Sequence, residues 1–147
     1  MSDVDFTKDS AFPAQQVGFF SMRNVKAKNR TAWLELFADD ALLQDPVGAS
    51  PLDPSGLGHR GKAAIGAFWD MVIADNNGTF RVRESYPCAN ECANVITLTQ
   101  TLPNGKPMDV NFVAVYRVND AGKIVSLKAY WQFDKMMEKF AELMASD

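Results

Sequence analysis

The chain has 147 residues, of which 47% are hydrophobic and 22% charged, and its formal net charge is -3 at pH 7. This length supports one domain with a real core rather than two, and the slightly acidic balance argues against nucleic acid or an anionic membrane as a partner. No apolar run approaches the roughly 20 residues of a membrane span, and the acidic N-terminus lacks the features of a signal peptide, so we expect a cytoplasmic protein.

The N-terminal half has the pattern of helices interrupted by one strand. Residues before about Ser10 are polar, and we expect residues 1–10 to be disordered. Pro13 suits the first turn of a helix, whereas the proline- and glycine-rich stretch that follows Asp45 is typical of a loop. The expected elements are helices over 13–28 and 31–37, a strand over 41–45, a loop over 46–60 and a helix over 62–74.

From residue 79 onward, hydrophobic and polar residues alternate, which is the period of strands. The expected strands cover 79–86, 92–99, 110–118 and 125–132, and an amphipathic helix over 133–144 follows them. This order predicts an α+β fold in a single domain, residues 1–147. In it, a curved antiparallel sheet wraps as a cone around the N-terminal helices, and a helix closes the chain.

Cysteine and histidine are too few to indicate a metal or redox site. The two cysteines, Cys88 and Cys92, do not form a Cys-x-x-Cys pair, and the sole histidine, His59, is distant from them in sequence. We therefore expect no metal, no cofactor and no structural disulfide.

The most informative residue is Asp45, an acid at the end of a short apolar strand and directly before Pro46. An aspartate before proline commonly begins a turn, where its side chain accepts local backbone N–H groups. The alternative is a carboxylate that points into a cavity and transfers protons, because burial would raise its pKa toward neutrality.

The segment that ends in Asp45-Pro46-Val47-Gly48 resembles the Δ5-3-ketosteroid isomerases. Residues 61–69 and 117–129 resemble the third helix and the last hairpin of that family. The likeness runs from about Phe20 to Trp131 and places the chain in the nuclear transport factor 2-like (SnoaL-like) superfamily. That superfamily includes isomerases, polyketide cyclases, dehydratases, epoxide hydrolases and non-catalytic domains, so the fold alone does not give the activity.

The resemblance implies that Asp45 is the general base. In the family, a tyrosine and a protonated aspartate bind the oxygen of the dienolate. Counting without gaps, these two positions fall on Ser21 and Ala114. Both oxyanion donors of the family are therefore missing, and losing one such donor typically slows catalysis by about 100- to 1000-fold.

Residues on the inward faces of the strands could supply the missing hydrogen-bond donors. We expect Tyr116 and Trp131 to act beside Asp45 as catalytic residues, since each offers an O–H or N–H. For each of them the alternative is a core residue whose polar tip finds a backbone partner. The expected substrate-binding residues are Val47, Phe68, Trp69, Val72, Tyr86, Asn94, Phe112, Ala114 and Leu127.

Two further residues have two interpretations each. Glu84 shares the alternating face of Tyr86. It is either a neutral carboxylic acid in the cavity or a charged residue that a bulge turns to solvent, and the second interpretation is favoured. His59 lies in the glycine-rich loop over 48–61 and is either part of a loop that folds over the cavity mouth or an exposed histidine.

The first functional hypothesis is a steroid delta-isomerase-like enzyme, an isomerase or lyase that performs cofactor-independent acid–base chemistry on a hydrophobic, steroid- or polyketide-like carbonyl compound. The alternatives are a non-catalytic protein that binds a hydrophobic small molecule and a polyketide cyclase/dehydratase-type enzyme. Thr97, Thr99 and Thr101 on one strand face suggest a sheet surface that forms a homodimer.

Overall fold

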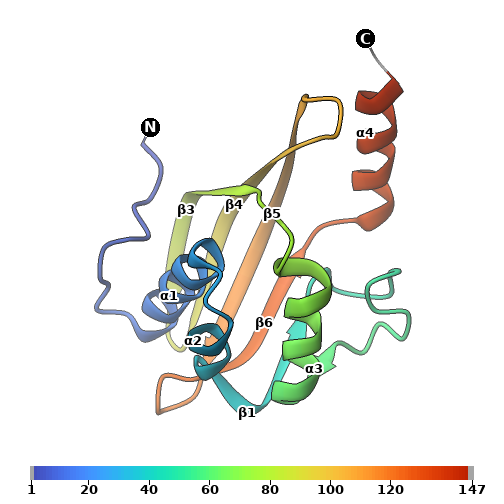
Figure 1. Cartoon of the computed structure of the whole chain (residues 1–147). Helices are drawn as coiled ribbons and strands as arrows, with labels where there is room; N and C mark the ends of the chain where they lie inside the picture. Colours follow the sequence, from blue (N-terminus) through green and yellow to red (C-terminus); the bar gives the residue numbers. More distant parts are fainter. Residues whose placement is uncertain (1, 146–147) are drawn as a thin grey trace.

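A six-stranded sheet in the order β2-β1-β6-β5-β4-β3 is the frame of the computed structural model, which describes residues 2–145 (Figure 1). The helices are α1 (Pro13–Ala27), α2 (Arg30–Glu35), α3 (Gly61–Phe68), the π-helical turn η1 (Trp69–Ile73) and α4 (Phe133–Ala145). The strands are β1 (Phe37–Gln44), β2 (His59–Arg60), β3 (Thr79–Cys88), β4 (Glu91–Thr101), β5 (Pro107–Val118) and β6 (Ile124–Tyr130).

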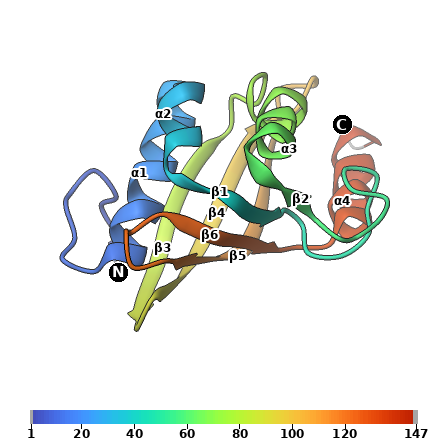
Figure 2. The same ribbon diagram turned by 90° about the horizontal axis from the view of Figure 1, so that it is seen from below.

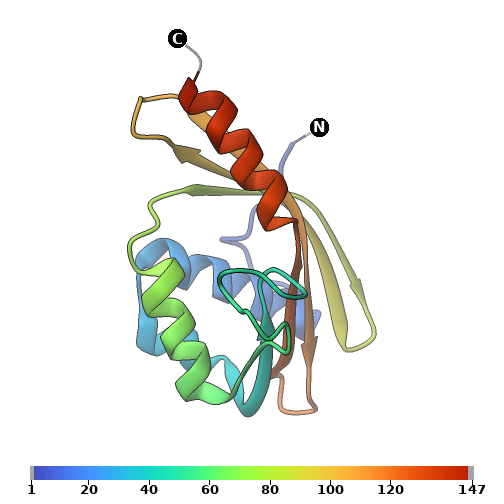
Figure 3. The same cartoon turned by 90° about the vertical axis from the view of Figure 1, so that its right-hand side faces the viewer.

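The sheet is strongly curved, and α1, α2 and α3 cover one of its faces (Figure 2). The strands β3 to β6 pair in antiparallel succession, as the sequence predicted, and α4 stands beside the far end of β4 and β5 (Figure 3). The α+β fold with a curved sheet around N-terminal helices and a C-terminal helix is thus confirmed. One feature was not predicted: β1 pairs with β6 in parallel, so the sheet is mixed.

Helix α1 presents one continuous face to the sheet. Its buried positions on that face recur at helical spacing and are Ala14, Val17, Gly18, Ser21 and Met22. The helix ends at Lys28, whose backbone is left-handed with φ 56° and whose N–H reaches the carbonyls of Asn24 and Val25.

The first strand begins earlier than its local sequence suggests. Residues up to Phe37 were expected to be helical, yet α2 ends at Glu35 and β1 starts at Phe37. Phe37 lies opposite Ile124 of β6 and is 1% exposed. Pairing with β6 and burial of the ring therefore override a local pattern that favours helix.

Strand β3 contains a bulge that changes which side chains face inward. Val82 lies opposite Ile96 but Glu84 lies opposite Val95, so Arg83 is the extra residue. This confirms the bulge interpretation for Glu84. Beyond the bulge the faces are exchanged: Tyr86 is 57% exposed, and its hydroxyl donates to Glu84 at 2.5 Å.

The N-terminal segment and the long loop are both tied to the body of the protein. The expectation of disorder over residues 1–10 differs from the structure, in which Val4 N–H donates to Val82 O at 2.7 Å and Arg23 Nε donates to Phe6 O at 2.7 Å. Met1 lies outside the described residues. In the loop, the buried carboxylate of Asp53 accepts from Ser55 Oγ and from the N–H of Gly58.

Trp33 is the centre of the helical side of the core. Its ring meets Phe37 edge-on at 4.7 Å and Trp69 at 5.1 Å. Across residues 2–145, none of the helices combines the length and the apolar composition that crossing a membrane requires.

Replacing Phe37 with alanine removes a buried ring from this contact. We expect Phe37→Ala to lower the free energy of unfolding by about 3–5 kcal/mol, measured by urea denaturation. Phe12→Ala is the matched control, because Phe12 is 56% exposed, and its change should stay within about 0.5 kcal/mol. Equal effects of the two changes would contradict this description of the core.

Candidate functional site

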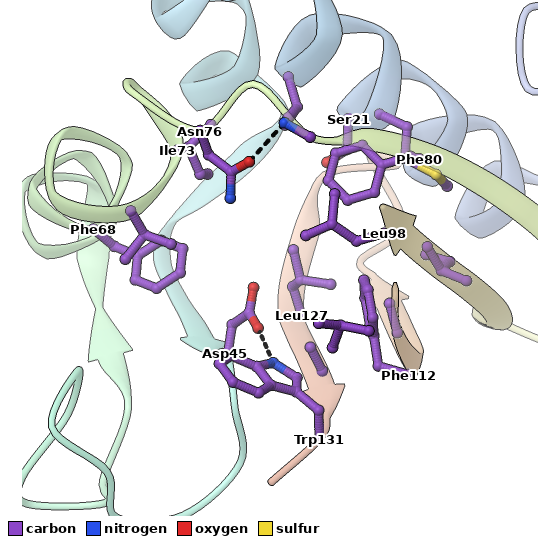
Figure 4. A pocket seen from close by; sticks show the side chains of 18 of the residues that line it. Ser21, Asp45, Phe68, Ile73, Asn76, Phe80, Leu98, Phe112, Leu127 and Trp131 are labelled. Carbon is purple, nitrogen blue, oxygen red and sulfur yellow. Dashed lines mark hydrogen bonds between the residues drawn. The ribbon is translucent and has the colours of Figure 1, made fainter. Parts of the chain in front are cut away.

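The concave face of the sheet and the helices enclose a cavity of about 660 Å³. Apolar side chains form most of its walls: Phe80, Leu98, Phe112 and Leu127 come from the sheet, and Phe68 comes from α3 (Figure 4). Among the described residues that line it, Asp45 is the only carboxylic acid. A volume of this size and an apolar lining are typical of sites for small hydrophobic molecules.

Asp45 and Trp131 meet because their strands run in the same direction. Asp45 directly follows β1 and Trp131 directly follows β6, and the C-terminal ends of parallel neighbours lie at the same edge of a sheet. Trp131 Nε1 donates to Asp45 Oδ1 at 2.6 Å (Figure 4). Next to this pair, Val47 N–H donates to Ala129 O at 3.0 Å and continues the contact between the two chain segments.

The pKa of the Asp45 carboxyl is raised above its ordinary value. Burial against apolar walls is the main cause, since it disfavours the charged form. The hydrogen bond from Trp131 and the charge of His59 act in the opposite direction and offset part of this effect. Asp45 is therefore a carboxyl group that takes up a proton more readily than an exposed aspartate.

A second polar group of the cavity joins α1, α2 and β5. Ser21 Oγ accepts from Trp33 Nε1 at 3.0 Å and from the hydroxyl of Tyr116 at 3.1 Å. Burial raises the pKa of Tyr116 to about 12, so its hydroxyl stays protonated at neutral pH. Gly18 lets the ring lie close to α1, because a Cβ at this position would be 3.1 Å from Tyr116 Cδ1.

Eight residues that the sequence singled out for catalysis or binding line this cavity. They are Asp45, Phe68, Val72, Phe112, Ala114, Tyr116, Leu127 and Trp131. The two expected donors are already engaged, because Trp131 N–H donates to Asp45 and Tyr116 O–H donates to Ser21.

Four expected binding residues lie outside the cavity lining. Val47 is 39% exposed, and Tyr86 is turned outward by the bulge in β3. Trp69 is buried behind Trp33, where it supports the wall rather than forming it. Asn94 is fully buried beneath α1, and its Oδ1 accepts from a serine hydroxyl of β3.

His59 lies on β2, half-buried, rather than in an exposed loop. Its ring lies 5.1 Å from that of Phe68, and its Nε2 has no hydrogen-bond partner among the described residues. Within residues 2–145, no group of three or more His, Cys, Asp or Glu side chains is arranged to hold a metal ion.

Sequence reasoning missed Ser21 and Trp33 as parts of the polar cluster. Ser21 was noted only as the place of a missing tyrosine. The available signal was a small hydroxyl residue one helical turn after Gly18 on the buried face of α1, at a position where a tyrosine from a strand can reach it.

The raised pKa of Asp45 makes its ionised form a cost to folding. This cost is absent below the pKa of an unfolded aspartate and is fully present above the pKa of the folded protein. We therefore expect Asp45→Asn, which keeps an acceptor for Trp131, to be more stable than the parent protein at pH 7, with the gain shrinking toward pH 4. Urea unfolding at both pH values tests this, with the exposed Asp120→Asn as the charge control; a gain that does not depend on pH would contradict it.

Comparison with known proteins places the chain in a family. The model of the SnoaL-like domain matches residues 19–127, which is most of the chain. Among solved structures, that of Rv0760c from Mycobacterium tuberculosis is 38% identical, with a TM-score of 0.78 and coverage of 86% of this chain and 96% of that chain. Rv0760c has also been solved in complex with estradiol-17beta-hemisuccinate, at 39% identity, a TM-score of 0.76 and coverage of 84% and 96%.

Two more solved structures are similar over the same region. The Δ5-3-ketosteroid isomerase from Mycobacterium sp. is 38% identical, with a TM-score of 0.76 and coverage of 84% of this chain and 96% of that chain. A computationally designed 17-OHP binder is 38% identical, with a TM-score of 0.76 and coverage of 84% and 94%. The chain belongs to the SnoaL-like, nuclear transport factor 2-like family and is a ketosteroid isomerase-like member of it.

Proposed function

We propose that this protein is a cofactor-independent acid–base enzyme that isomerises a hydrophobic, steroid-like carbonyl compound, with Asp45 as the base. The observation that carries the proposal is the Asp45 carboxylate, held by Trp131 at 2.6 Å on the wall of an apolar cavity of about 660 Å³. Burying a carboxylate in an apolar cavity costs free energy. A structural role does not require this cost, whereas carboxylates with a perturbed pKa are common in active sites.

In this reaction the ionised Asp45 removes a proton from the carbon next to the carbonyl. The electron pair of the broken C–H bond moves onto the carbonyl oxygen and gives an enolate. Asp45 then returns the proton to the carbon at the far end of the conjugated system, and the double bond has moved without any net change in atoms or electrons. The raised pKa of Asp45 favours the first half of this cycle, because a more basic carboxylate takes a proton from carbon more readily than an exposed aspartate does.

Trp131 acts here as a positioning residue. Its indole N–H can only donate, so it fixes one carboxylate oxygen and leaves the second one directed to the ligand. The same hydrogen bond stabilises the ionised form, which keeps Asp45 available as a base.

A non-catalytic binding protein is the second candidate. Ala114, a methyl group, stands on the cavity wall where the family resemblance implies an acidic donor, and Trp131 N–H is already engaged by Asp45. Similarity to Rv0760c, solved with a steroid hemisuccinate, supports a hydrophobic ligand equally in both cases. Turnover of a steroid distinguishes the two functions, and turnover of a polyketide-like compound in its place would indicate a cyclase or dehydratase.

We further propose a homodimer formed through the outer face of the sheet. Thr97 and Thr99 of β4 lie on that face, where their hydroxyls donate to Asn111 and Asp109 of β5 at 2.6 Å. An internally hydrogen-bonded strand surface of this kind suits contact with a second copy. A monomeric mass in solution by light scattering would reject this state without bearing on the cavity.

The first functional test is isomerisation of 5-androstene-3,17-dione, followed by the absorbance of the conjugated product. We expect Asp45→Asn to reduce kcat by about 10²- to 10⁴-fold, since this is the usual contribution of a general base. The substitution keeps the shape of the side chain, and Asp120→Asn is the control. Turnover that survives in Asp45→Asn would reject the base assignment, whereas equilenin binding without turnover in the parent protein would favour the binding function.

The pH profile gives a separate test of Trp131. Activity requires ionised Asp45, so kcat/KM should fall as the pH drops through the raised pKa of that carboxyl. Trp131→Phe removes the hydrogen bond that lowers this pKa, and the acid limb should move to higher pH. An acid limb at the same pH in Trp131→Phe would show that the indole does not tune the base.

A further inference from the structure

Ser21 of α1, Trp33 of α2 and Tyr116 of β5 form a buried polar cluster, and Ser21 lies on the other side of the cavity from Asp45 (Figure 4). All three line the cavity, and their side chains are only 2–4% exposed in relative area. Each polar atom of this cluster is therefore far from bulk water.

Counting protons identifies an unused donor. The Trp33 indole can only donate, so Ser21 Oγ accepts from it. The two hydroxyls of Ser21 and Tyr116 carry two protons, and the hydrogen bond between them uses one. Because Tyr116 is the donor in that bond, the remaining proton is that of Ser21, and both lone pairs of its oxygen are occupied.

This remaining proton has no acceptor among residues 2–145. A serine inside a helix usually donates to the backbone carbonyl four residues before it, but no such bond to Val17 O is formed. A buried hydroxyl without an acceptor is costly. Ser21 lines the cavity, so a ligand bound there is the group that could accept this proton.

We propose that Ser21, supported by Tyr116 and Trp33, donates a hydrogen bond to the carbonyl oxygen of the ligand and so replaces the missing oxyanion donors. The nature of the ligand rests on the proposed function, whereas the donor itself rests on the cluster. Two hydrogen bonds received by the Ser21 oxygen polarise its O–H and strengthen it as a donor. Tyr116 stays protonated at neutral pH, so it keeps donating to Ser21 throughout the range in which Asp45 ionises.

In this arrangement the two reacting atoms of the ligand face different sides of the cavity. The carbonyl oxygen lies toward Ser21, and the neighbouring carbon lies toward Asp45. Electron density that Asp45 displaces from the C–H bond then accumulates at the oxygen that Ser21 contacts. A donor at that oxygen is therefore more strongly bound in the enolate than in the ketone, which is the condition for catalysis.

The test uses 4-androstene-3,17-dione, whose enone absorption moves to longer wavelength when its oxygen accepts a hydrogen bond. We expect a red shift on binding to the parent protein, a smaller one in Ser21→Ala and none in the double variant Ser21→Ala/Tyr116→Phe, in which Tyr116 cannot turn its own hydroxyl to the ligand. Binding should weaken about three- to tenfold, and kcat should fall about 100- to 1000-fold in the double variant. Ser126→Ala is the control, since Ser126 is buried outside the cavity lining.

A full red shift in the double variant would overturn the proposal, as would the absence of any red shift in the parent protein. If the double variant does not unfold cooperatively, Ser21→Cys takes its place: a thiol is a weaker donor of similar size, and a shift equal to that of the parent protein would overturn the proposal. Asp45→Asn separates the two proposals, because it should abolish turnover and keep the red shift. A red shift that depends on Ser21, with no turnover, would reject the isomerase proposal and support Ser21 as a donor. Turnover that depends on Asp45, with a red shift that the Ser21 variants do not change, would support the isomerase and reject Ser21 as a donor.

Discussion

The parallel contact between β1 and β6 is the constraint on which the rest of the site depends. Trp131 and Asp45 are 86 residues apart, and they meet because both strands end at the same edge of the sheet. The antiparallel strands β3 to β6 send successive ends to opposite edges, so they cannot bring two strand ends together in this way. Curvature of the sheet and the covering helices then place this edge inside an apolar cavity rather than at the surface.

The site separates two kinds of polar group by how they respond to burial. Burial raises the pKa of Asp45 above its ordinary value, so this carboxyl takes up a proton more readily, and it raises the pKa of Tyr116 to about 12, so this hydroxyl stays protonated at neutral pH. Proton transfer therefore falls to one residue, while the hydroxyl cluster keeps a fixed protonation state. The same burial that prepares Asp45 for chemistry makes its ionised form unfavourable for folding, a trade between stability and activity that is common in enzymes.

The sequence predicted those features that one local pattern determines. Alternation located β3 to β6, and the Asp-Pro junction after β1 singled out Asp45, which lies on the wall of the cavity. The prediction for Tyr86 failed because one extra residue, Arg83, exchanges the two faces of β3, and a bulge has no reliable signature in a single sequence. The partners of Asp45 and Ser21 depend on contacts across the fold, namely the direction of β1 relative to β6 and the approach of β5 to α1, which no periodicity encodes.

Ser21 and Ala114 change the size of the side chains that line the cavity as well as its hydrogen-bond donors. Both are small side chains at places where the family resemblance implies larger polar ones, and both line the cavity. A short serine on α1 reaches a ligand as an oriented donor only if other groups fix its hydroxyl, and Trp33 and Tyr116 do this from α2 and β5. A donor built from three elements depends on the packing between them, and for this reason its strength is coupled to the core around Trp33 in a way that a single tyrosine would not be.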